Sequence, residues 1–176
     1  MKTPFELLGV EARFDLSEAT LDQRQKELSL ELHPDRFAGR PAAERRAALN
    51  LAIEVNAAHR LLKDPIQRGE ALLRAMGVEI DEATEPPAEP AFLMEMMEAR
   101  ESLREWGQKE EVEKIESALE KFQLRQAETI ENLTRLFSGL DIESSDSIST
   151  VRQALAPLRY FRRYFDEANA YLDELI

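Results

Sequence analysis

The chain has 176 residues, with 35 acidic and 23 basic side chains, two histidines and no cysteine, which give a formal net charge of −12. A net charge of this sign repels phosphate backbones and anionic lipids, and so argues against a general nucleic-acid-binding or membrane-surface protein. Without cysteine the chain forms no disulfide and offers no thiolate to a metal ion or cluster.

Apolar residues recur at helical spacing along most of the chain, and the period-2 patterns of strands are nearly absent, which predicts an all-α protein. In the first half, Leu21, Leu28 and Leu32 share one helical face. Pro34 should end that helix, because proline lacks a backbone N–H and clashes with the preceding turn. The expected helices of this half are Glu18 to Leu32, Pro41 to Lys63 and Ile66 to Met76.

The second of these helices carries an apolar residue every four positions. The residues that stack in this way are Leu49, Ile53, Ala57 and Leu61. Asp64-Pro65 should end the helix and cap the next one, whose C-terminal side is marked by Gly77.

Three longer helices are predicted in the second half, where heptad-like apolar positions favour a packed antiparallel three-helix bundle. The expected helices are Ala91 to Trp106, Glu110 to Phe137 and Ser147 to the C-terminal end. Gly107 should break the first of them and Ser138-Gly139 should stop the second, while Pro157 predicts a kink or a break in the third. The apolar positions are Val112, Ile115, Leu119, Phe122, Ile130, Leu133, Leu136 and Phe137.

The negative charge lies entirely in the second half. Residues 1–76 carry 12 basic and 12 acidic side chains, whereas residues 77–176 carry 11 basic and 23 acidic ones. The run 81–90 is acidic and proline-rich with almost nothing to bury, which is typical of a linker. We therefore expect an N-terminal domain over 1–76, a linker over 77–90 and a helical bundle over 91–176.

No stretch approaches the roughly 18 consecutive apolar residues of a membrane-spanning helix. The first five residues lack the apolar run of a signal peptide and the Arg/Ser-rich character of a transit peptide. We expect a soluble cytoplasmic protein.

The turn between the first two long helices carries the most distinctive motif, His33-Pro34-Asp35. Pro34 forces the backbone out of the helix, so His33 and Asp35 should be presented on a sharp, exposed turn. The residues alone also fit a plain helix-ending turn, since Asp and Pro are common there.

This tripeptide between two amphipathic helices resembles the J-domain, the module that stimulates ATP hydrolysis by DnaK-type chaperones. Further segments resemble one branch of that family, the HscB-type co-chaperones of iron–sulfur cluster assembly. These segments are Pro4 to Val10, Asn56 to Pro65 with Arg68, and Ala91 to Glu98. The resemblance covers nearly the whole chain and implies a J-domain followed by a scaffold-binding three-helix bundle.

The resemblance also implies two sets of binding residues. The residues implied to bind the chaperone are His33, Pro34 and Asp35, with Arg24, Lys26 and Arg36 assisting. The residues implied to bind the scaffold are Leu93, Met94, Met97, Glu98, Glu101 and Tyr160.

The residues alone leave open whether the apolar surface that begins the bundle packs inside it or binds a partner. Leu93, Met94, Met96 and Met97 supply more apolar surface than one amphipathic stripe needs, and flexible methionines suit an adaptable partner surface. The resemblance favours a partner surface.

The implied function is that of a co-chaperone which stimulates an HscA-like DnaK-type chaperone and delivers an IscU-like iron–sulfur scaffold to it. No enzyme is predicted, because the chain has no Glu-x-x-His pair, no glycine-rich phosphate loop and no recognisable nucleophile motif. We expect no catalytic residue, no metal site and no cofactor. Two alternatives remain open: a J-domain adapter for another client, and a structural bundle in which the His-Pro-Asp turn is accidental.

Overall fold

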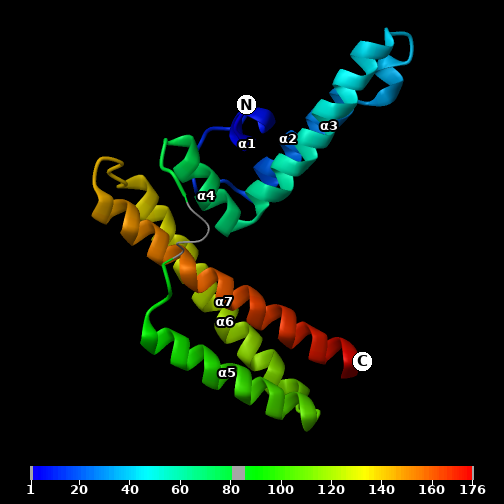
Figure 1. The fold of residues 1–176 in the computed structure, drawn as a ribbon. Coiled ribbons are helices and arrows are strands. Elements are labelled where there is room, and N and C mark those ends of the chain that lie inside the picture. Colours follow the sequence, from blue (N-terminus) through cyan, green and yellow to red (C-terminus); the bar gives the residue numbers. More distant parts are fainter. Residues whose placement is uncertain (1, 81–85, 176) are drawn as a thin grey trace. The chain divides into compact units, whose positions relative to one another are not determined.

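The computed structural model describes residues 2–80 and 86–175, and these residues form helices and connecting turns without a strand. The chain divides into two compact units, Met1–Ile80 and Asp81–Ile176. The prediction of an all-α fold is confirmed. The first unit contains α1 (Pro4–Leu8), α2 (Glu18–Glu31), the 3-10 turn η1 (Pro34–Phe37), α3 (Ala42–Lys63) and α4 (Pro65–Ala75) (Figure 1). The second unit contains α5 (Pro90–Gln108), α6 (Val112–Ser138) and α7 (Ser145–Leu175).

In the first unit, α2 and α3 lie side by side as a helical hairpin that η1 closes at one end (Figure 1). Helices α1 and α4 pack against α3, and together with α2 they enclose a small apolar core. Its largest fully buried side chains are Phe5, Leu8, Leu21, Leu62, Leu72 and Leu73. Burial of each such side chain contributes about 1.5–3 kcal/mol, which makes this core the main stabilising element of the unit.

The four-residue apolar stripe on α3 is not the packing face of that helix. Leu49 and Ile53 are 56% and 58% exposed. The buried residues of α3 are Ala48, Val55, Ala58 and Leu62. The helix carries apolar residues on two neighbouring faces, and spacing alone does not tell which of them meets the rest of the unit.

The open end of the hairpin is joined by a charged network between α2 and α3. His59 Nε2 lies 2.7 Å from the Asp22 carboxylate, and Lys63 Nζ donates to the same oxygen at 3.2 Å. Lys63 also lies 3.3 Å from the Glu18 carboxylate. Hydrogen bonds from His59 and Lys63 lower the pKa of the Asp22 carboxyl, and the bonds to Asp22 and Glu18 raise the pKa of Lys63.

The second unit is a three-helix bundle in which α6 and α7 pack along each other and α5 packs against both (Figure 1). Five of the eight predicted apolar positions of α6 are buried: Ile115, Leu119, Phe122, Leu133 and Phe137. From α7 the largest fully buried side chains are Leu155, Phe161 and Tyr164, and α5 adds Met96 and Leu103. The predicted bundle is therefore confirmed.

The predicted break at Gly107 is wrong, and of the kink or break predicted at Pro157 the break is absent. Helix α5 continues through Gly107 to Gln108, and a Cβ at Gly107 would lie 2.5 Å from the ring of Tyr171 on α7. The glycine thus allows close helix packing and does not end the helix. Helix α7 likewise continues through Pro157, so the break that this residue predicted is absent.

The predicted linker lies partly on residues 81–85, which are outside the described residues. On its two sides, residues 78–80 and 86–89 have no regular secondary structure, and α5 begins at Pro90. None of the described helices combines the length and the hydropathy that crossing a bilayer requires.

The charged network predicts a pH-dependent contribution to stability. Because the folded-state pKa of Asp22 lies below its ordinary 3.8, the pairing stabilises the folded protein above that pH. This stabilisation is lost as the pH falls through the lowered pKa. We expect Asp22→Asn to lower the Tm at neutral pH and the difference from wild type to disappear at pH values well below 3.8, in thermal melts followed by circular dichroism.

Glu31→Gln is the matched control, because Glu31 is an exposed carboxylate on the same helix and outside the network. It should melt like the wild type throughout. An equal loss in both variants, or a loss from Asp22→Asn that persists at acidic pH, would contradict the assigned role of the network.

Candidate functional site

The His-Pro-Asp turn is held by bonds within the turn itself. Pro34 occupies the first position of η1, and His33 caps it, with its Nδ1 accepting from the Asp35 backbone N–H at 3.3 Å. The Arg36 backbone N–H donates to the His33 carbonyl at 3.0 Å. The His33 and Asp35 side chains are 55% and 92% exposed, so both are available to a partner.

The two basic residues predicted on α2 have different environments. Arg24 Nε donates to the carbonyl of Leu8, the last residue of α1, at 3.2 Å, and Arg24 Nη1 donates to Glu27. Gly9 caps α1 with φ +63°, and a Cβ there would lie 2.8 Å from Arg24 Nη2. Lys26 is exposed, and no ion pair of this lysine occurs among the described residues. Arg24 thus holds α1 against α2 while its side chain stays 37% exposed, and Lys26 is fully available to a partner.

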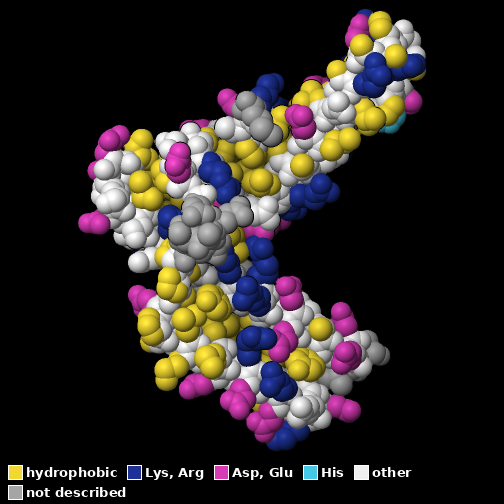
Figure 2. Space-filling model, viewed as in Figure 1, with side chains coloured by type: hydrophobic (Ala, Val, Ile, Leu, Met, Phe, Trp, Pro, Cys, Tyr) yellow, Lys and Arg dark blue, Asp and Glu magenta, His cyan; other side chains and the backbone are white. Residues whose placement is uncertain are grey.

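On α5, the predicted scaffold-binding residues form an outward face. Met94 and Met97 are 64% and 71% exposed, and Glu98 and Glu101 are exposed beside them. Met96 is instead the buried methionine, at 2%. The packing alternative therefore holds for Met96 fully and for the half-buried Leu93 in part. Figure 2 shows hydrophobic side chains gathered over the first part of α5. Leu93 is half-buried at the edge of this face.

Tyr160 of α7 lies next to the start of α5. Its ring meets the ring of Phe92 edge-on, with centroids 5.8 Å apart, and Phe92 meets Phe161 at 5.5 Å. Phe92 precedes Leu93 in the chain, so the structure brings Tyr160 close to the α5 residues with which it was predicted to act.

A cation at the centre of this aromatic cluster was not predicted from the sequence. The Arg125 guanidinium on α6 lies 5.8, 5.6 and 5.8 Å from the ring centroids of Phe92, Phe122 and Phe161, which come from three different helices. It also donates to Glu95 on α5. A single arginine within a long amphipathic helix carries no motif, and only the arrangement of the three helices identifies it.

The described residues contain no group of three or more histidine or acidic side chains placed to hold a metal ion. The chemistry that these two surfaces offer is recognition: a polar turn in one unit and an apolar face with an acidic border in the other.

Comparisons with known proteins identify the family. A family model described as the HSCB C-terminal oligomerisation domain matches residues 88–169, which include α5, α6 and most of α7. A co-chaperone protein HscB homolog of Burkholderia vietnamiensis is 34% identical over 172 residues, which are 97% of this chain and 94% of that protein. The chain belongs to the HscB co-chaperone family. A second HscB homolog, of Burkholderia multivorans, has the same identity and coverage.

Solved HscB structures have the same fold. Chaperone HscB from Vibrio cholerae is 26% identical with a TM-score of 0.82, covering 99% of this chain and 100% of that one. Human co-chaperone HscB is 28% identical with a TM-score of 0.78, covering 97% of this chain and 82% of that one. The J-domain and bundle architecture implied by the resemblance is confirmed, and these relatives are named as chaperones or co-chaperones and not as enzymes.

The different environments of Arg24 and Lys26 predict different effects of their removal. Arg24→Ala removes the bonds to the Leu8 carbonyl and to Glu27. It should lower the free energy of unfolding in urea by about 1 kcal/mol, because a hydrogen bond from a charged donor is stronger than a neutral one but is partly screened by solvent here. Lys26→Ala, on the same helix, should unfold like the wild type. Equal stabilities of the two variants would contradict the structural role of Arg24.

Proposed function

We propose that this HscB family member stimulates the ATPase of an HscA-like DnaK-type chaperone and delivers an IscU-like iron–sulfur scaffold to it. The observation that carries the proposal is that two recognition surfaces, one on each unit, are exposed and not used in packing. They are the His33–Asp35 turn and the face of α5 that Met94 and Met97 present.

The turn acts on the chaperone without donating a catalytic group. Phosphoryl transfer depends chiefly on positioning, so a ligand that binds the hydrolysis-competent state of the chaperone more tightly speeds the reaction by shifting the population toward that state. His33, Pro34 and Asp35 make the contact, and the exposed cations of Lys26 and Arg36 assist. Arg24 contributes by holding α1 and α2 in place.

The α5 face binds the scaffold. Met94 and Met97 supply adaptable apolar contact area, Glu98 and Glu101 border it with negative charge, and Leu93 and Tyr160 extend it. A scaffold surface that matches it is apolar with basic residues at its edge. Holding the scaffold while the other unit engages the chaperone raises the scaffold's effective concentration at the chaperone's substrate site.

The ATPase claim is tested with the purified chaperone and a His33→Gln variant. The variant should fail to stimulate steady-state ATP hydrolysis, because the side chain that caps the turn and faces the partner is lost. His59→Gln is the matched control: it changes the other histidine, at the opposite end of the hairpin, and should stimulate like the wild type. Full stimulation by His33→Gln would exclude the J-domain function.

The scaffold claim is tested by calorimetric titration of the purified scaffold into wild type and a Leu93→Ala/Met97→Ala variant. The double substitution removes an exposed methionine of the apolar face and the leucine at its edge, and should weaken binding by about tenfold or more, as for loss of interface hot spots.

Leu124→Ala is the control for this titration, because Leu124 is a 65% exposed leucine on α6 outside the face. It should bind the scaffold normally. A wild-type protein that does not bind the scaffold, or a folded double variant that binds it unchanged, would show that the client is a different protein or the surface a different one.

A further inference from the structure

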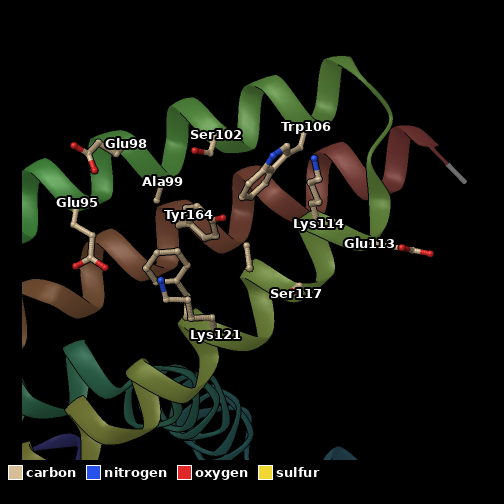
Figure 3. Close-up of a pocket in the computed structure, with 12 residues that line it drawn as sticks. Glu95, Glu98, Ala99, Ser102, Trp106, Glu113, Lys114, Ser117, Lys121 and Tyr164 are labelled. Carbon is tan, nitrogen blue, oxygen red and sulfur yellow. The ribbon is translucent and has the colours of Figure 1, made fainter.

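The bundle contains a cleft to which the predicted scaffold-binding residues contribute Glu98 alone. Helices α5, α6 and α7 line an open cleft of about 630 Å³ (Figure 3). Small side chains on the facing sides of α5 and α6 leave this space open: Ala99, Ser102, Ser117 and Ala118. The volume falls within the range of roughly 300–1,000 Å³ of sites that hold a small ligand or a short peptide segment.

Aromatic side chains supply the apolar part of the cleft. Trp106 of α5, the only tryptophan in the chain, is half-buried on one wall of the cleft. Phe122 of α6 and Tyr164 of α7 also line the cleft and are buried. Figure 3 shows the Tyr164 ring between α5 and α6, with its hydroxyl directed toward the side where Trp106 lies.

The Tyr164 hydroxyl has no hydrogen-bond partner among the described residues, although its side chain is fully buried. Burial raises the pKa of Tyr164 to about 12, so the hydroxyl stays protonated and can donate. A buried donor without an acceptor is uncommon in folded proteins, and it marks the floor of the cleft as a place where an entering carbonyl would be stabilised.

The rim carries charges of both signs, with Glu95, Glu98 and Glu113 against Lys114 and Lys121. Glu95 pairs with Arg125, and Lys114 pairs with Glu111 at 2.9 Å. Lys121 lies over the Phe122 ring, 5.7 Å from its centroid. A rim of this kind exerts no strong field of one sign, which favours an apolar segment over a highly charged ligand.

The cleft is continuous with the scaffold-binding face, because Glu98 belongs to both. Met94 and Met97 lie on one side of this residue along α5, while Ala99 and Ser102 line the cleft on the other. A partner that covers the two methionines therefore reaches the mouth of the cleft without leaving the surface of α5.

We propose that the cleft receives an apolar segment of the iron–sulfur scaffold. This inference rests on the proposed function, and it adds a concave binding site to the α5 face of Met94 and Met97. The segment packs against Trp106 and Phe122 and brings a backbone carbonyl toward Tyr164. Concave sites often hold the side chains that contribute most to binding, whereas a flat helical face supplies mainly shape complementarity.

The inference is tested by replacing a small residue that lines the cleft with a larger one. Ala118→Leu should weaken scaffold binding by about tenfold or more, because the added side chain occupies the space that the segment needs. Ala127→Leu makes the same change at an exposed position of α6 outside the cleft and should bind like the wild type. Circular dichroism checks that each variant is folded. Ser117→Leu fills the cleft from an exposed position of its wall and replaces Ala118→Leu if that variant does not fold.

A second readout follows the cleft directly. With 5-fluorotryptophan incorporated into this chain alone, the fluorine resonance of Trp106 should shift when the scaffold is added to wild type or Ala127→Leu, and should not shift with Ala118→Leu. A scaffold that binds without moving this resonance would overturn the inference, and so would normal binding by the filled variant.

Failure of the inference and failure of the proposed function give different results. If Leu93→Ala/Met97→Ala weakens binding while Ala118→Leu does not, the face binds the scaffold and the cleft is not its anchor. If the wild-type protein does not bind the scaffold at all, both the proposed function and the inference are wrong.

Discussion

The C-terminal unit depends on the contact between the Arg125 guanidinium and three aromatic rings from three helices. Each cation–π contact of this kind contributes about 0.5–2 kcal/mol, depending on how far it is shielded from water, and the bond to Glu95 adds a charge-assisted tie to α5. Together they determine the rotation of α5 about its own axis. Successive residues are about 100° apart on a helix, so a helix that turns Phe92 and Met96 inward must turn Met94 and Met97 outward.

Local features of the fold were predictable from the sequence, and features that depend on a distant residue were not. Pro34 dictates the end of α2 by its own backbone chemistry, so the exposed turn follows from the sequence. The sequence wrongly predicts a helix end at Gly107. The glycine is needed because the ring of Tyr171, 64 positions later, occupies the space that a side chain at position 107 would take. Spacing also could not show which face of α3 is buried, or that Arg24 is held by the carbonyl of Leu8.

The candidate site divides in the same way. The exposed methionines of α5 are close together in the sequence, and a run with more apolar surface than one stripe needs is recognisable from the residues alone. The cleft cannot be recognised from the sequence. Its walls include small residues of two helices that form no motif, and its floor is a tyrosine from a third helix. The uneven distribution of charge along the chain indicates the domain division but not the individual site residues. It separates a neutral J-domain from an acidic bundle, and in the proposed function the two units meet different partners.

The exposure of Met94 and Met97 has a consequence for redox chemistry. In a chain without cysteine, methionine is the main side chain that oxidants attack reversibly, and among the described methionines these two are the most exposed, while Met96 is shielded. Conversion to the sulfoxide makes the thioether polar and chiral. By exposure, an oxidant would therefore reach the face of α5 before Met96 in the core of the bundle. Reduction by methionine sulfoxide reductases would restore the apolar surface, so scaffold binding by this face, as proposed above, would vary with the oxidant level around it.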